Sequence, residues 1–117
     1  MTPVVAGWVR TPFSRAHKGK LANIRPESMV SKCIMEIVSR LNVNPVDIDD
    51  VIVGCAYPEG EQGYNIGRMA ALLSNLPETV PGVTINRLCG SSMQAAISAA
   101  NAISVGQGEC YVVAGVE

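Results

Sequence analysis

The chain has 117 residues, of which 48% are hydrophobic and 16% are charged, and its formal net charge is −1. This length suffices for one domain with a modest core. The sequence has no basic stripe interleaved with aromatic residues, no apolar run near the ~20 residues that cross a membrane, and no signal-peptide pattern. We therefore expect an intracellular protein that neither binds nucleic acid nor spans a membrane.

Apolar strand-like segments alternate with helical patterns along the chain. The first helix opens with Pro26 and Glu27, which suit the first turn, and Asn65 is a suitable N-cap for the second. The apolar residues inside each helical segment keep the spacing of one helix face. The expected strands cover residues 3–9, 51–56, 82–86 and 110–115, and the expected helices cover residues 26–41, 65–75 and 91–105, with a short helical turn at 45–48.

The order of these elements is β-α-β-α-β-α-β, with no internal repeat. The strand segments are continuous apolar runs, which are typical of strands buried on both faces. We therefore predict an α/β fold class in which a mainly parallel, incomplete sheet is covered by helices on both faces.

The third helical segment carries no charged residue. No charge occurs anywhere between Leu88 and Gly108, and alanine is frequent in this stretch. A surface helix normally shows a charged face opposite its apolar stripe. We therefore expect this helix to be central and buried on every side, between two layers.

Cys89 lies where the third strand segment turns into this helix. A cysteine at a helix start has the positive end of the helix dipole near its sulfur, which stabilises a thiolate. We expect Cys33, Cys55 and Cys110 to be buried, reduced thiols that pack as small hydrophobic residues. Because no two cysteines have CxxC-type spacing, we expect no metal site.

The residues around Cys89 resemble the active-site signature of the thiolase family. The run is Asn86-Arg87-Leu88-Cys89-Gly90-Ser91-Ser92-Met93-Gln94, and its form is most similar to the 3-ketoacyl-CoA thiolases of fatty-acid β-oxidation. The resemblance extends over the whole chain, including residues 9–13, 62–68, 80–87 and 114–117. It implies that residues 1–117 are the N-terminal part of the thiolase N-terminal domain, without the loop domain and the C-terminal half.

The resemblance also implies an acyl-transfer mechanism with Cys89 as the catalytic nucleophile. In the family, the equivalent cysteine attacks a 3-ketoacyl-CoA, acetyl-CoA leaves, and coenzyme A then collects the acyl group from the cysteine. Acyl-CoA and coenzyme A are therefore the expected substrates, and no further cofactor is expected. The Cys89 backbone N–H is expected to contribute to an oxyanion hole, while Asn86, Arg87 and Gln94 are expected to pack and hydrogen-bond around the turn.

Several parts of the family pattern are absent from this chain. The family's activating histidine, second catalytic cysteine and coenzyme A-binding loop all lie later in its sequence. The one histidine, His17, lies in a basic loop far upstream, where we expect a solvated surface residue. The chain alone is therefore expected to be inactive, because Cys89 lacks its general base.

Two alternatives fit the same sequence. The chain could come from a biosynthetic, acetoacetyl-CoA-forming thiolase, or it could be a truncated, non-catalytic assembly or binding module. For the thiolase we expect a homo-oligomer, either a dimer or a tetramer. Association with a partner subunit of a β-oxidation complex is a further option. We expect the protein in the cytoplasm, or in the mitochondrial matrix or peroxisome if its source is eukaryotic.

Two further patterns have simpler interpretations than phosphate binding. The basic residues Arg15, Lys18, Lys20 and Arg25 are interpreted as a solvated loop, since charged residues are usually at the surface. The pair Gly60 and Gly63 lacks the strand–GxGxxG–helix arrangement of a phosphate loop and is interpreted as a turn.

Overall fold

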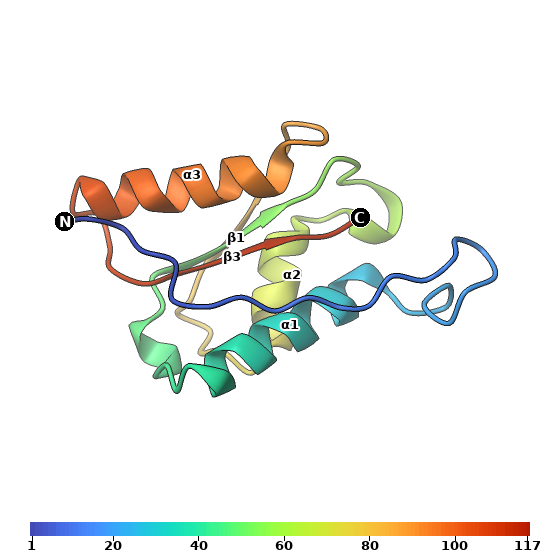
Figure 1. Cartoon of the computed structure of the whole chain (residues 1–117), viewed down its shortest axis with the longest axis horizontal. Coiled ribbons are helices and arrows are strands. Elements are labelled where there is room, and N and C mark those ends of the chain that lie inside the picture. Colours follow the sequence, from blue (N-terminus) through green and yellow to red (C-terminus); the bar gives the residue numbers. More distant parts are fainter.

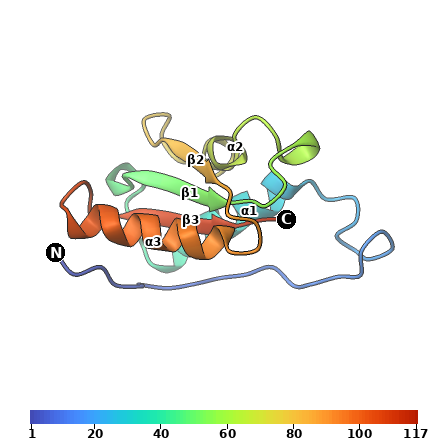
Figure 2. The ribbon, with the colours of Figure 1, turned by 90° about the horizontal axis from the view of Figure 1, so that it is seen from above.

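The computed structural model describes residues 1–117 (Figure 1) and contains a three-stranded parallel sheet in the order β2-β1-β3 (Figure 2). The central strand is β1 (Asp50–Gly54), and β2 (Gly82–Ile85) and β3 (Tyr111–Gly115) form the two edges. Four of the five β1 residues are buried in a continuous run. This is the pattern of a strand with neighbours on both sides and helices on both faces, so the predicted fold class is confirmed.

Helices cover both faces of the sheet. On one face lie α1 (Pro26–Arg40) and α2 (Ile66–Leu73), and on the other lies α3 (Ser91–Ser104) (Figures 1 and 2). Successive side chains of β1 alternate between these two layers, as the pleat requires. Val51 and Val53 pack with residues of α1 and α2, whereas Ile52 packs with Ala95 and Ala99 of α3.

The connections explain why the helices lie on opposite faces. The chain passes from β1 to β2 through α2, and then back across β1 to β3 through α3. Parallel crossovers are nearly always right-handed, so a reversal of direction along the sheet moves the next helix to the other face. All three strands therefore end at one edge of the sheet, at Gly54, Ile85 and Gly115. Two single-turn 3-10 helices, η1 (Pro45–Asp47) and η2 (Gly60–Gln62), complete the secondary structure.

The prediction of a buried first strand at residues 3–9 is wrong. Residues 1–13 make no backbone–backbone hydrogen bond, and Val4, Val5 and Trp8 are 76–88% exposed. The segment runs extended beside the sheet without joining it (Figure 2), and Gly7 rests on side chains of α1. The segment does not pair with the open outer edge of β3, and at Gly7 it lies against the side chains of Ile37 and Leu41 at the end of α1. Strand-like composition alone does not make a strand, because strand preference depends on packing against neighbouring elements.

The prediction that the third helix is buried on every side is also wrong for this chain. Its buried residues, Ser91, Ala95 and Ala99, form one stripe against the sheet. On the other face, Met93 is 70% exposed and Ile97 is 45% exposed. The missing charges therefore reflect an apolar outer face that no other part of this chain covers. No helix in the structure combines the length and the apolar character needed to cross a membrane.

Candidate active site

Cys89 lies in the turn that joins β2 to α3, at the edge where all three strands end. It is an exposed free thiol, whereas Cys55 is buried and Cys33 and Cys110 are half-buried. The prediction that the other three are buried is therefore confirmed for Cys55, while Cys33 and Cys110 remain partly accessible. Among the four cysteines, Cys89 is the one classed as exposed to solvent.

Side chains tie this turn together from both ends. The side chain of Asn86 accepts a hydrogen bond from the Leu88 N–H at 2.9 Å. The Ser91 hydroxyl accepts one from the Arg87 N–H at 2.9 Å and donates one to the Leu88 carbonyl at 2.5 Å. Leu88 has φ +46°, in the left-handed region that residues with a β-carbon rarely adopt. Cys89 is thus presented on a tight, internally bonded turn.

Helix α3 begins two residues after Cys89, at the position that the sequence predicted. Gly90 is the N-cap residue and Ser91 is the first helical residue. The backbone N–H groups of Ser92 and Met93 have no hydrogen-bond acceptor in the protein. Such free first-turn N–H groups form the positive end of the helix dipole. Such N–H groups are free to donate to an anionic oxygen placed beside the turn.

Two glycines allow α3 to sit directly on the strand ends. A β-carbon at Gly54 would overlap the backbone of Ser91 and Ser92, and one at Gly115 would overlap the Ser92 side chain. Because neither strand carries a side chain there, the first turn of α3 lies in van der Waals contact with β1 and β3. The ends of β1 and β3 therefore pack against the first turn of α3, which directly follows the turn that bears Cys89.

Glu117 connects the end of β3 to the segment that follows β1. Its carboxylate accepts hydrogen bonds from the Ala56 N–H at 2.9 Å, the Tyr57 N–H at 3.1 Å and the Gln62 side chain at 3.3 Å. The Cys55 sulfur lies 3.9 Å from the same carboxylate. Burial raises the pKa of the Cys55 thiol above its ordinary value, and the negative charge of Glu117 acts in the same direction.

The sequence signalled some of these contacts and not others. Asn86 bonds around the turn as expected, and Arg87 does so through its backbone N–H. The side chain of Gln94 donates instead to Ser98, one turn along α3 at 3.3 Å. Ser91 and Glu117 lie within the thiolase-like motifs, but the sequence alone indicates no role for either. For Glu117 a usable signal existed, because a carboxylate directly after a strand lies at the same edge as the other strand ends.

The remaining candidates make no hydrogen bond or ion pair with the Cys89 turn. His17 is exposed in the basic loop, as predicted. The basic residues of this loop are exposed, and Arg25 pairs with Glu27 and Glu61. Residues 60–63 form the 3-10 turn η2, in agreement with the turn interpretation. No cluster of three or more potential metal ligands occurs in the structure.

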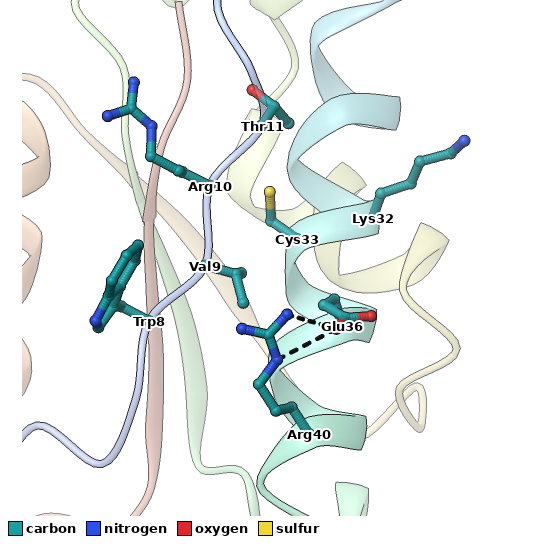
Figure 3. A pocket seen from close by; sticks show the side chains of 8 residues that line it. All are labelled: Trp8, Val9, Arg10, Thr11, Lys32, Cys33, Glu36 and Arg40. Carbon is teal, nitrogen blue, oxygen red and sulfur yellow. Dashed lines mark hydrogen bonds and ion pairs between the residues drawn. The ribbon is translucent and has the colours of Figure 1, made fainter.

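A groove of about 330 Å³ lies between the N-terminal segment and α1 (Figure 3). Its walls include Trp8 and Arg10 on one side and Cys33 on the other, and Arg40 is paired with Glu36 across one turn of α1 at 2.7 Å. The side chains of Arg10 and Lys32 point away from each other (Figure 3). The groove contains no residue of the Cys89 turn, so we do not assign the chemistry to it.

An exposed thiol on a hydrogen-bonded turn before a helix is an arrangement found at cysteines that act as nucleophiles. Comparison with known proteins gives the class more closely: residues 3–117 match the model of the thiolase N-terminal domain family. The chain belongs to the thiolase family.

Relatives and a solved structure agree with this assignment. The 3-ketoacyl-CoA thiolase of Colwellia psychrerythraea is 44% identical over 97% of this chain, and that of Pseudoalteromonas translucida is 45% identical over 98%. The crystal structure of the acetyl-CoA acetyltransferase of Bacillus anthracis superimposes with a TM-score of 0.79 at 40% identity, over 85% of this chain and 25% of that protein. The chain spans about 30% of the length of the two 3-ketoacyl-CoA thiolases.

Proposed function

We propose that this chain supplies the nucleophile-bearing part of a thiolase that cleaves 3-ketoacyl-CoA into acetyl-CoA and a shortened acyl-CoA. The observation that carries the proposal is the exposed thiol of Cys89 on the turn before α3, within a chain that belongs to the thiolase family. The names of the relatives support the choice of a 3-ketoacyl-CoA substrate. Coenzyme A enters as the second substrate, and the proposal requires no further cofactor.

The proposed reaction has two acyl transfers. The Cys89 thiolate attacks the keto carbon of the substrate, and the carbon–carbon bond next to that carbon breaks. Its electron pair goes to the departing acetyl-CoA carbanion, which takes up a proton, while the shortened acyl group stays on sulfur as a thioester. The thiol of coenzyme A then loses its proton and attacks the thioester, which releases acyl-CoA and regenerates the Cys89 thiolate. The free N–H groups near Cys89 support the charges that develop in these steps.

The proton-transfer groups are not part of the site that this chain forms. Cys89 has no side-chain hydrogen-bond partner, and His17 is the one histidine of the chain. The family resemblance assigns the general base, the second cysteine and the coenzyme A-binding loop to the part of the relatives that this chain does not cover. The proposal therefore includes that residues 1–117 alone have no turnover, since loss of a general base removes ~10²–10⁴-fold of rate.

A biosynthetic, acetoacetyl-CoA-forming enzyme is the second candidate, and the similarity to an acetyl-CoA acetyltransferase favours it. The two candidates differ in the acyl chain they accept. The test is a thiolysis assay on the complete product of the gene, with 3-ketoacyl-CoA substrates of increasing chain length and with Cys89→Ala as the control. Turnover of long-chain substrates that Cys89→Ala abolishes supports the degradative enzyme, and activity confined to acetoacetyl-CoA supports the biosynthetic one.

A non-catalytic module is the third candidate. The mass of the native gene product separates it from an enzyme, because a product of full thiolase length contradicts a truncated module. A native product of 117 residues without turnover would instead contradict the enzymatic proposal. We further propose a cytoplasmic homodimer or homotetramer that can take a β-oxidation partner subunit. The apolar outer face of α3 supports association.

A further inference from the structure

We propose that Ser91 is a positioning residue for Cys89. Its buried hydroxyl holds the turn between β2 and α3 and so fixes the backbone of Cys89 directly before the first helical turn, whose Ser92 and Met93 N–H groups are free. This inference rests on the proposed role of Cys89 as a nucleophile.

The Ser91 hydroxyl forms hydrogen bonds with residues that precede Cys89 in the sequence. The hydroxyl accepts from the Arg87 N–H at 2.9 Å and donates to the Leu88 carbonyl at 2.5 Å. It thereby uses both its donor and an acceptor site on the two residues that directly precede Cys89. Ser91 as a whole residue is only 4% exposed, so water does not compete freely for these bonds.

The turn needs such a restraint because Leu88 adopts an unfavourable backbone conformation. Its φ of +46° lies in the left-handed region, and its side chain is exposed, so side-chain burial does not hold it there. A residue with a β-carbon stays in this region only where its surroundings fix it. The Leu88 carbonyl accepts hydrogen bonds from the Ser91 hydroxyl at 2.5 Å and from the Ser91 backbone N–H at 3.1 Å, and the Leu88 N–H donates to the Asn86 side chain. The hydroxyl alone also accepts from the Arg87 N–H, so it adds a restraint that the backbone bond does not supply.

Ser91 itself cannot easily move. Its backbone lies directly over Gly54 of β1, where no side chain intervenes. The hydroxyl is therefore fixed relative to the sheet, and it passes that position on to Leu88 and Cys89. Without the hydroxyl, we expect Leu88 to relax toward ordinary backbone angles and to carry Cys89 away from the Ser92 and Met93 N–H groups.

The experiment compares Ser91→Ala with Ser104→Ala in the complete gene product. Ser104 lies in the same helix and bonds within it, to the Ala100 carbonyl, far from the turn. The rate of iodoacetamide alkylation is measured at each cysteine by peptide mapping over a pH series. We expect Ser91→Ala to slow Cys89 by roughly two- to fivefold near neutral pH, the size of a helix-dipole effect. Cys33 should keep its rate in both variants, and Ser104→Ala should leave Cys89 unchanged.

A merely structural role would give a different pattern. If Ser91→Ala left the Cys89 rate unchanged, or raised the rates of all four cysteines together, the inference would be wrong. If Ser91→Ala does not fold, hydrogen exchange of the backbone amides in the unmodified protein provides the test instead. The Arg87 N–H should then be protected by its bond to Ser91, and exchange as fast as in an open loop would overturn the inference. Neither readout requires turnover, so the inference and the proposed function can fail separately.

Discussion

The carboxylate of Glu117 accepts a hydrogen bond from the backbone N–H of Ala56 at 2.9 Å. The two residues are distant in sequence, yet each comes just after a strand that ends at the same edge of the sheet. The same carboxylate also accepts from Tyr57 and Gln62. Glu117 therefore holds the segment after β1 against the end of β3, beside the edge that bears Cys89.

Replacing this carboxylate should loosen the segment after β1. In Glu117→Gln, an amide group that can donate replaces one of the two accepting oxygens, so one or more of the backbone N–H groups loses its acceptor. We expect the free energy of unfolding to fall by about 1–2 kcal/mol, because hydrogen bonds to charged groups are among the stronger ones. Urea denaturation measures the change. Glu78→Gln is the matched control, since the Glu78 side chain is exposed and makes no hydrogen bond, and an equal loss in both variants would contradict the role of Glu117.

Gly54 should tolerate no side chain. A β-carbon there would overlap the Ser91 backbone, so Gly54→Ala must push α3 away from β1. We expect a loss of about 3 kcal/mol or more, at the upper end for overpacked sites. Gly90→Ala is the control, because a β-carbon there meets its nearest atom at an ordinary 3.5 Å, and it should cost within about 1 kcal/mol as an N-cap change. Thermal unfolding of the two variants decides the point, and equal melting temperatures would show that α3 is not in close contact with β1.

The chain should lose stability at alkaline pH. Burial raises the pKa of the Cys55 thiol above its ordinary 9.0 in the folded state, and the same cause raises the pKa of Cys110. Below pH 9.0 both states keep these thiols protonated, so their contribution is fully present. Above it, the unfolded chain releases protons that the folded chain retains, and stability falls as pH rises toward the folded pKa, by up to about 1.4 kcal/mol per pH unit for each thiol. Cys55→Ala should show a shallower decline in denaturation across this range, and an unchanged slope would exclude a contribution from Cys55.

Cys89 should be the most reactive of the four cysteines. It is exposed and lies beside free helix N–H groups, whereas Cys55 is buried and has a raised pKa. Iodoacetamide labelling of the folded protein, followed by peptide mapping, tests this order. Labelling of Cys33, Cys55 or Cys110 at an equal or higher rate would refute the prediction. Circular dichroism of the same sample confirms that the protein is folded during labelling.

The isolated 117-residue chain should associate in solution. The outer face of α3 exposes Met93 and Ile97, and β2 and β3 both have an unpaired edge. Exposed apolar patches and open strand edges both favour association. Light scattering measures the molar mass. A cooperatively unfolding monomer of 12.3 kDa would show that these surfaces are stable in water. Met93→Lys and Ile97→Lys together should weaken association through the helix face and leave pairing through strand edges intact.

The sequence allowed prediction of those features that local patterns determine. Apolar runs such as the one containing Val51 and Val53 identified the buried strand, and Asn65 identified a helix start that its side chain indeed caps at the Arg68 N–H. The thiolase-like run around Cys89 located the thiol at the junction of β2 and α3. These features depend on residues close together in the chain.

Features that depend on distant partners were not predictable in the same way. Residues 3–9 have a strand-like composition, but strand formation also depends on contacts with distant elements. This segment lies against side chains at the end of α1 and leaves the open edge of β3 unpaired. The charge-free stretch indicated that α3 lacks a normal surface, but not how many of its faces this chain covers. The hydrogen bonds of the Ser91 hydroxyl and of the Glu117 carboxylate depend on the backbone geometry of the fold, so no sequence pattern predicts them.

The central claim is that Cys89 carries the acyl group, and acyl trapping tests it most directly. The complete gene product is mixed with a 3-ketoacyl-CoA in the absence of free coenzyme A, quenched in acid and mapped by mass spectrometry. We predict an acyl thioester on Cys89, removed by added coenzyme A and absent from Cys89→Ala. An acyl group on another cysteine, or turnover that persists in Cys89→Ala, would contradict this account.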